Sequence, residues 1–135
     1  IKIHQTDLTL TSCVKAKLEP FNLAPEQNLI MMLLWEKDGL TQNQIVEILG
    51  KDKTNIARMA LNLENKGFIK RIGCPDDRRS LKLYLTPEGH ALSKQVVPTL
   101  EEFNDIICEG ISKEELVFLE KILLKFNKNV QKFSE

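Results

Sequence analysis

The spacing of hydrophobic residues along the chain predicts a protein made mainly of helices. A weakly patterned helix covers residues 3–19 and ends at Pro20, and a second helix runs from Pro25 to about residue 37. Proline suits the first position of a helix, because its missing N–H would be unpaired there. The segment from Leu29 to Trp35 is apolar on all sides, so we expect the second helix to be buried on most of its faces.

Two shorter helices follow, about three residues apart. Thr41 and Gln44 form a capping box that opens the first of them, and Gly50 closes it. Asp52 can cap the second, at about residues 53–66. The second helix has an inward stripe at helical spacing, made of Ile56, Met59, Ala60 and Leu63. Two helices joined by a short turn that contains glycine are the arrangement of a helix-turn-helix.

A β-hairpin is predicted directly after these helices. An extended segment from Phe68 to Ile72 leads into residues 73–80, which are rich in turn-forming residues. The following strand alternates at a period of two, with apolar side chains at Leu81, Leu83 and Leu85. We interpret the two strands and their basic loop as a wing, and the alternative is a plain surface hairpin.

The C-terminal part of the chain predicts two long helices. The first starts at Thr86-Pro87-Glu88 and contains Pro98, which should kink or divide it. Ser112 and Glu115 form a capping box that opens the last helix. That helix carries an apolar seam at steps of three and four residues, made of Leu116, Leu119, Leu123, Phe126, Val130 and Phe133. We expect this seam to pack on a second copy of the chain, and the alternative is packing within one chain.

These elements predict a single domain over residues 1–135, mainly α with a small β-hairpin wing. A winged helix-turn-helix lobe at about residues 25–89 would lie between long terminal dimerisation helices, at about residues 1–24 and 90–135. The length of 135 residues fits one domain.

The net charge of zero hides an uneven distribution of charged residues. Residues 51–82 carry nine Lys and Arg against four acidic residues, a net charge of +5. Residues 1–50 have four Lys against six acids, and residues 83–135 have six Lys against nine acids. The middle third would therefore attract a polyanion, although a solvated charged surface has the same composition.

The outward face of the helix after Asp52 carries side chains suited to DNA. Asn can bind adenine and Arg can bind guanine through two hydrogen bonds each, and this helix is the one that a helix-turn-helix inserts into the major groove. The candidate residues are Lys53, Thr54, Asn55, Arg58 and Asn62. Leu61 lies beside this face, where it would contact either thymine methyl groups or its own protein.

The hairpin tip adds further candidates. Arg78 and Arg79 can enter a narrow minor groove, where the negative potential is enhanced, and Asp77 can hold the guanidinium of Arg79 in place. The alternative is a local ion pair that stabilises the turn. Lys82, like Lys70 and Lys53, would mostly attract phosphates.

With these motifs the sequence resembles the MarR family (multiple antibiotic resistance regulators) of bacterial transcription factors. The resemblance covers about half of the chain, residues 23–90, and rests on Pro25–Gln27, Asp52–Arg58, Leu63–Arg71, Asp76–Arg79 and Leu85–Gly89. It implies a homodimer whose two lobes read double-stranded DNA at a pseudo-palindromic operator. The family's contacts on the recognition helix and the wing fall on Thr54, Asn55, Arg58 and Arg79. Ala57 and Lys51 depart from the family pattern, which leaves the DNA sequence open.

The resemblance also implies a repressor that releases DNA when a small, often aromatic, ligand binds between the lobe and the dimer helices, near Trp35. A different form of regulation would be redox sensing. Cys74 is a candidate for it, because nearby arginines favour its thiolate. Cys13 does not match the sensing position of redox-responsive relatives. A winged-helix module that binds only protein is a third interpretation, although the basic island argues against it.

Other chemistry is not expected. The two histidines, His4 and His90, have no partner at ligand spacing, so we predict neither a metal site nor a cofactor. The sequence has no nucleophile elbow or phosphate loop, so we do not expect an enzyme. No apolar run reaches the roughly 18 residues of a membrane span, and the odd number of cysteines fits the cytoplasm.

Overall fold

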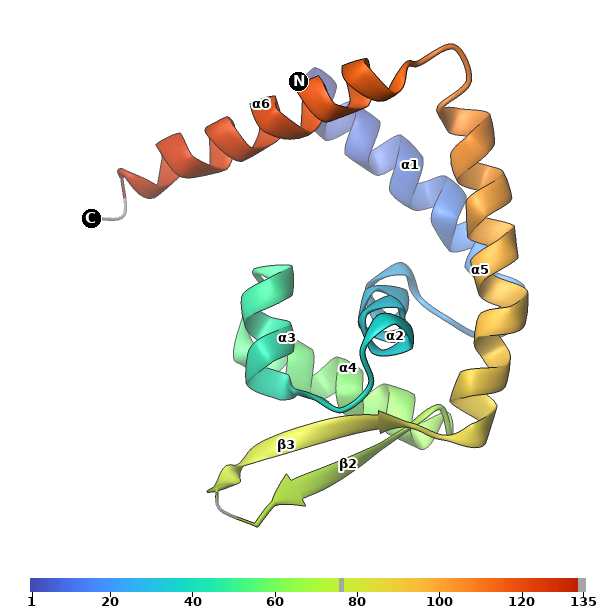
Figure 1. Ribbon diagram of the computed structural model, residues 1–135, viewed down its shortest axis with the longest axis vertical. Coiled ribbons are helices and arrows are strands. Elements are labelled where there is room, and N and C mark those ends of the chain that lie inside the picture. Colours follow the sequence, from blue (N-terminus) through green and yellow to red (C-terminus); the bar gives the residue numbers. More distant parts are fainter. Residues whose placement is uncertain (76, 134–135) are drawn as a thin grey trace. The chain divides into compact units, whose positions relative to one another are not determined.

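The computed structural model describes residues 1–75 and 77–133, without the side chains of Cys74 and of residues 77–80. The chain divides into two units, Ile1–Leu100 and Glu101–Glu135, which are described separately. In chain order the elements are α1 (Lys2–Leu18), the short 3-10 helix η1 (Glu19–Phe21), α2 (Pro25–Glu36), β1 (Leu40–Thr41), α3 (Gln42–Leu49), α4 (Lys53–Asn65), β2 (Ile69–Cys74), β3 (Asp77–Leu85), α5 (Pro87–Ile107) and α6 (Lys113–Gln131) (Figure 1). The chain is mainly α with a small antiparallel sheet, as predicted.

The core of the first unit lies where α2, α3, α4 and the sheet meet. Its members are apolar side chains with almost no exposed surface, among them Ile30, Met31, Leu34, Ile45, Ile56, Leu63, Ile69 and Leu83. Leu18 of α1 and Val96 of α5 belong to the same core. Burial of this apolar surface is the main stabilising term of the fold, and it fixes the orientation of α4.

The sheet has three strands in the order β1-β3-β2, all antiparallel. Leu83 of the central strand β3 pairs with Leu40 on one side and with Arg71 on the other. Strand β1 was not predicted, because two residues are too few to show an alternating pattern. Strand β3 also begins at Asp77, several residues before the predicted start, because pairing continues past a β-bulge at Gly73/Cys74 as far as Cys74 and Asp77.

Two further expectations hold only in part. Helix α2 is buried or half-buried on most of its surface, as expected, but the apolar residues Leu29 and Met32 are 40% and 47% exposed. Of the kink or division that Pro98 predicts, division does not occur, because α5 runs as one helix through Pro98. A proline inside a helix removes one backbone hydrogen bond, and this loss does not end the helix here.

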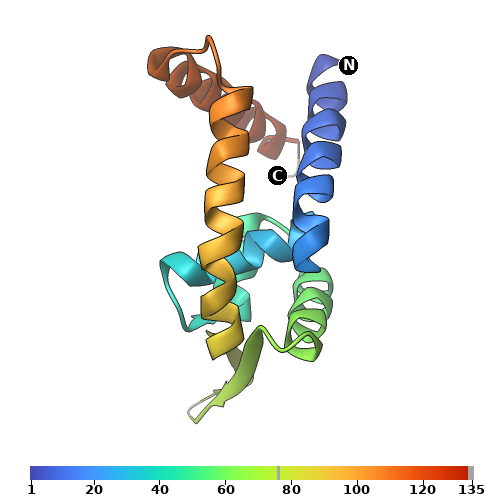
Figure 2. The same cartoon turned by 90° about the vertical axis from the view of Figure 1, so that its right-hand side faces the viewer.

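The arrangement of the first unit separates its wing from its long helices. Figure 2 shows α1 and the first turns of α5 leading away from the lobe on the side opposite the hairpin of β2 and β3. Strands β2 and β3 therefore extend from the lobe on the side away from α1.

Candidate nucleic-acid interface

Helix α4 is held at its start by a cap that the sequence predicts. The Asp52 carboxylate accepts a hydrogen bond from the backbone N–H of Asn55 at 2.7 Å. This satisfies one of the N–H groups that a helix leaves unpaired at its start, and the remaining ones give that end a partial positive charge. The first turn of α4 is therefore suited to lie against phosphate.

The preceding helix is built in the same way. The Thr41 hydroxyl accepts from the N–H of Gln44 at 3.1 Å, and the Gln44 side chain accepts from the N–H of Thr41 at 2.9 Å. Gly50 ends α3 in the left-handed conformation, with φ 65°, which turns the chain toward Asp52. The buried Ile45 of α3 and Ile56 of α4 belong to one core, so the two helices form the predicted helix-turn-helix.

The two faces of α4 have opposite character. Ile56, Met59, Ala60 and Leu63 are buried, as predicted, and they turn the opposite side of the helix outward. The outward side carries Lys53, Thr54, Arg58, Leu61, Asn62 and Asn65, all exposed, and the half-buried Asn55. The structure thus brings together all the α4 residues that the sequence predicts for DNA contact.

Asn55 and Arg58 form a hydrogen-bonded pair on the outward face of α4. The Nη2 group of Arg58 donates a hydrogen bond to Oδ1 of Asn55, one turn earlier in the helix. This bond uses one of the five N–H donors of the guanidinium and restricts the rotamers of a long side chain. Arg58 is therefore oriented along the outward face of α4, and less rotamer entropy would be lost when it binds a ligand.

The wing is tied to α4 by an ion pair that the sequence analysis missed. Glu64 accepts hydrogen bonds from the backbone N–H of Arg71 at 3.0 Å, from its Nε at 3.3 Å and from its Nη2 at 3.1 Å. These bonds, the side-chain ones first, lower the pKa of Glu64 below its ordinary value, although partial burial opposes the shift. Opposite charges seven residues apart around Gly67 were the only indication in the sequence.

The wing places two exposed lysines on its strands. Lys82 lies in β3 between Thr41 of β1 and Ile72 of β2, and Lys70 of β2 pairs with Tyr84. Asp77, Arg78 and Arg79 lie in β3, but their side chains are outside the described part of the structure. Their roles at the wing tip stay predictions.

The end of α4 is joined to the region between α1 and α2. Lys66 donates hydrogen bonds to the backbone carbonyl of Asn22 and to Oε1 of Gln27, both at 2.7 Å. Burial lowers the pKa of Lys66. Near the other end of α4, Lys51 lies 3.5 Å from Glu26 of α2, so the lysine that departs from the family pattern makes an ion pair with the core helix.

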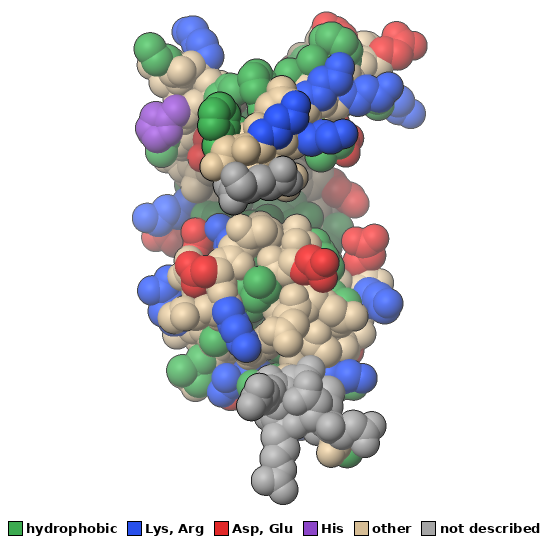
Figure 3. Space-filling view, turned by 90° about the vertical axis from the view of Figure 1, so that its left-hand side faces the viewer, with side chains coloured by type: hydrophobic (Ala, Val, Ile, Leu, Met, Phe, Trp, Pro, Cys, Tyr) green, Lys and Arg blue, Asp and Glu red, His purple; other side chains and the backbone are tan. Residues whose placement is uncertain are grey.

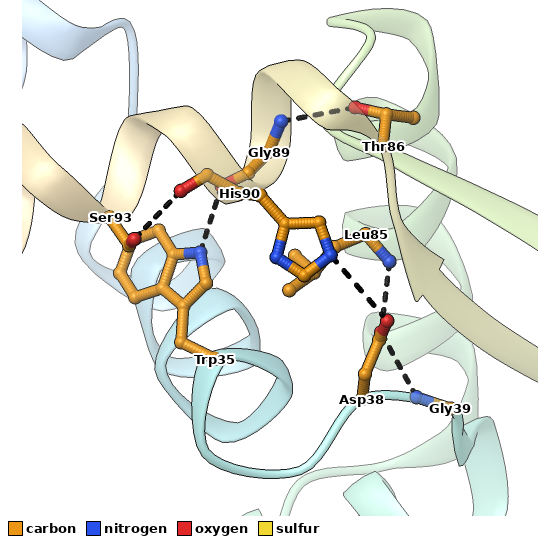
Figure 4. A network of polar contacts seen from close by, with 8 residues as sticks. All are labelled: Trp35, Asp38, Gly39, Leu85, Thr86, Gly89, His90 and Ser93. Carbon is orange, nitrogen blue, oxygen red and sulfur yellow. Dashed lines mark hydrogen bonds and ion pairs between the residues drawn. The ribbon is translucent and has the colours of Figure 1, made fainter.

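The start of α5 is fastened to the lobe by a second group of polar contacts (Figure 4). The Trp35 indole N–H donates to the carbonyl of Gly89 at 2.9 Å. The Thr86 hydroxyl donates to the carbonyl of Gly67 at 2.6 Å and accepts from the N–H of Gly89 at 3.1 Å. Asp38 accepts from the N–H of Leu85 at 2.9 Å. These contacts join the ends of α2, α4 and β3 to the first turn of α5.

Gly89 is required at this junction for a steric reason. A Cβ added there would collide with the backbone carbonyl of Phe68, which itself accepts a hydrogen bond from the N–H of Thr86 at 3.1 Å. Backbone atoms held in this way cannot move aside. His90, the next residue, lies 3.9 Å from Asp38 at the edge of the same group.

In the second unit, α6 has the predicted capping box between Ser112 and Glu115. None of the residues of α6 is buried within the chain, although the helix carries many apolar side chains. The predicted seam is exposed along its length, at Leu116, Leu119, Leu123, Phe126, Val130 and Phe133.

The described surface of the lobe offers side chains suited to recognition. Figure 3 shows one side of the molecule, where acidic and basic side chains are dispersed over the lobe. No cluster of three metal-ligating side chains occurs in the described part of the chain. Of the cysteines whose side chains are described, Cys13 is exposed and Cys108 is half-buried. No helix of the described residues is long and apolar enough to cross a membrane.

Comparison with known proteins agrees with this geometry. Residues 23–81, which span α2 to the middle of β3, match the model of the MarR family. The chain is 26% identical over 127 residues to the HTH-type transcriptional regulator YybA of Bacillus subtilis (strain 168), and the match covers 91% of this chain and 82% of that protein.

Solved structures of similar proteins include complexes with DNA. A MarR family transcriptional regulator of Listeria monocytogenes, complexed with a 26mer DNA, is 26% identical with a TM-score of 0.83, and the alignment covers 96% of this chain and 86% of that one. MepR of S. aureus, also complexed with DNA, is 25% identical with a TM-score of 0.85, over 95% of this chain and 94% of that one.

Proposed function

We propose that the chain is a transcriptional regulator of the MarR family and that it binds double-stranded DNA in a sequence-specific manner. The match of its residues 23–81 to the model of that family and its similarity to an HTH-type transcriptional regulator support this proposal. The expectation that the chain is not an enzyme agrees with its similarity to transcriptional regulators. The outward face of α4 carries the proposal, with Thr54, Asn55 and Arg58 displayed on a helix whose other face is fixed in the core.

In this proposal α4 enters the major groove. Arg58 and Asn55 would hydrogen-bond to base edges, and Asn62 and Thr54 to bases or phosphates. Lys53, Lys70 and Lys82 would neutralise phosphates, and Arg79, held by Asp77 beside Arg78, would reach the minor groove. The DNA complexes of the similar proteins from Listeria and S. aureus support DNA as the partner.

We further propose that the chain acts as a homodimer through its terminal helices. The apolar seam of α6 supports this, because a single chain leaves Phe126, Val130 and Phe133 largely in water. Two copies related by a twofold axis would present two α4 helices to a pseudo-palindromic operator. Regulation as a repressor that a small ligand releases is the form that the sequence resemblance supports.

The experiment that tests the proposal is selection of bound duplexes from a random pool at two salt concentrations, followed by affinity measurements. We expect an enriched pseudo-palindrome with steep salt dependence. Arg58→Ala should lower affinity for the enriched duplex by about 1–3 kcal/mol and relax its specificity. Lys82→Ala should weaken binding to all duplexes alike and reduce the salt slope by about 1.

Lys94→Ala, at an exposed lysine of α5, is the matched control and should change neither quantity. Equal losses on selected and random duplexes for Arg58→Ala would contradict its assignment to base contact. The absence of any enriched duplex would contradict DNA recognition and favour a surface that docks protein. Loss of binding on oxidation, prevented by prior alkylation of the thiols, would identify redox sensing as the input.

A further inference from the structure

The outward face of α4 contains one apolar side chain that the proposed function does not use. Leu61 is 43% exposed, although it belongs to the helix that contributes Ile56, Met59 and Leu63 to the core. It follows Arg58 by three residues and Thr54 by seven, which is about two full helical turns. Thr54, Arg58, Leu61 and Asn65 therefore form one stripe along the helix, opposite the buried side.

We propose that Leu61 is a specificity-determining residue that contacts the methyl group of a thymine in the major groove. The inference rests on the proposed DNA binding through α4. A single exposed leucine needs no explanation by itself, because much of any protein surface is apolar. The position of Leu61 is what distinguishes it, since it shares the centre of the outward face with Thr54 and Arg58.

The chemistry of the major groove restricts what Leu61 can accept. Each base pair presents hydrogen-bond donors and acceptors there, and only thymine adds an apolar group, its C5 methyl. The leucine side chain has no donor or acceptor, so against guanine or cytosine it would cover polar edges without replacing their hydrogen bonds to water. Against thymine it would bury one methyl group.

The expected effect follows from the size of that contact. Burying one methyl group corresponds to a change of about threefold to fivefold in affinity for each half-site. Because Leu61 lies about 4.5 Å further along α4 than Arg58, the thymine should lie within one or two base pairs of the base that Arg58 contacts. The inference therefore predicts both a base and its approximate place in the operator.

The test uses the duplex enriched in the selection, with each thymine replaced in turn by deoxyuridine, which removes only the methyl group. Fluorescence anisotropy then compares the wild-type protein with Leu61→Ala, a truncation of an exposed side chain that should leave the fold intact. We expect a threefold to fivefold loss for the wild type at one thymine of each half-site and no loss for Leu61→Ala at the same thymine.

Ile48→Ala is the matched control, because Ile48 is an apolar residue of α3 that is 56% exposed and lies outside the stripe. This variant should keep the full sensitivity to deoxyuridine. The inference is overturned if the wild type binds the selected duplex but, at every deoxyuridine position, loses the same DNA affinity as Leu61→Ala does. A wild type that selects no duplex at all would instead contradict the DNA binding on which the inference rests.

Discussion

The tie between α4 and the wing can be tested through Glu64. Its carboxylate accepts three hydrogen bonds from Arg71, one of them from the backbone N–H at 3.0 Å. A hydrogen bond to a charged acceptor contributes about 1.5 kcal/mol to stability, and the partly exposed guanidinium pair adds about 0.5 kcal/mol. Glu64→Gln keeps one acceptor oxygen, so it should lower the free energy of unfolding by about 1 kcal/mol, half of the total.

The assay is thermal and denaturant unfolding at a fixed protein concentration, because dissociation of a dimer would make stability depend on concentration. A loss of 1 kcal/mol corresponds to about 3–5 °C in Tm for a chain of this size. Glu47→Gln, at an exposed position of α3, is the matched control and should stay within about 0.5 kcal/mol of the wild type.

The pH dependence has a defined sign. Because Arg71 holds the pKa of Glu64 below its ordinary value of 4.5, the ionised form is favoured in the folded state. Its contribution to stability is therefore fully present above about pH 4.5 and is lost as the pH falls through the lowered pKa. The difference between the wild type and Glu64→Gln should be constant from pH 6 to 8 and should shrink below about pH 4.5. The reasoning would be refuted if the difference in free energy of unfolding between the wild type and Glu64→Gln stayed unchanged from pH 7 to pH 3. It would also be refuted if a double-mutant cycle of Glu64→Gln and Arg71→Ala gave a coupling energy near zero.

Two other predictions concern the junction and the dimer. Gly89→Ala should lower the free energy of unfolding by about 1–3 kcal/mol, because its Cβ meets the backbone carbonyl of Phe68. Gly73→Ala, with open space around its Cβ, is the control and should have little effect. Equal effects of the two variants in denaturant unfolding would contradict the steric argument. Leu123→Glu should shift the oligomer toward monomer in analytical ultracentrifugation, because it places a charge in the α6 seam. Lys121→Glu, on the opposite face of α6, should cause no such shift. A dimer unchanged by Leu123→Glu would exclude this seam as the interface.

The parts of the fold that local chemistry determines could be predicted from the sequence. The caps at Thr41 and Ser112 were identified as capping boxes and the cap at Asp52 from its residue type alone, and all three side chains accept the hydrogen bond of an N-cap. The inward stripe of α4 followed from helical periodicity, and its outward face followed with it. A candidate site that lies on one face of one helix is therefore accessible to sequence analysis.

The polar contacts that join the helices of the lobe could not be predicted, because they link residues far apart in the sequence. Lys66 bonds to Asn22, 44 residues away, and Trp35 to Gly89, 54 residues away. Nothing in residue types or spacing indicates such pairs. The exposure of Met32 was missed for a related reason, since hydrophobicity does not say which face of a helix lacks a partner.

These long-range contacts bear on how DNA binding would be regulated. Thr86 joins the end of α4 to the first turn of α5 through Gly67 and Gly89, and Trp35 adds the end of α2 to the same turn. A rotation of α4 against the start of α5 would break these hydrogen bonds and leave buried polar groups unpaired, at a cost of about 1–3 kcal/mol each. An effector that alters operator affinity would therefore move the lobe and the start of α5 together. In the proposed homodimer, the quantity to be changed is then the spacing of the two α4 helices, and not the conformation of either one.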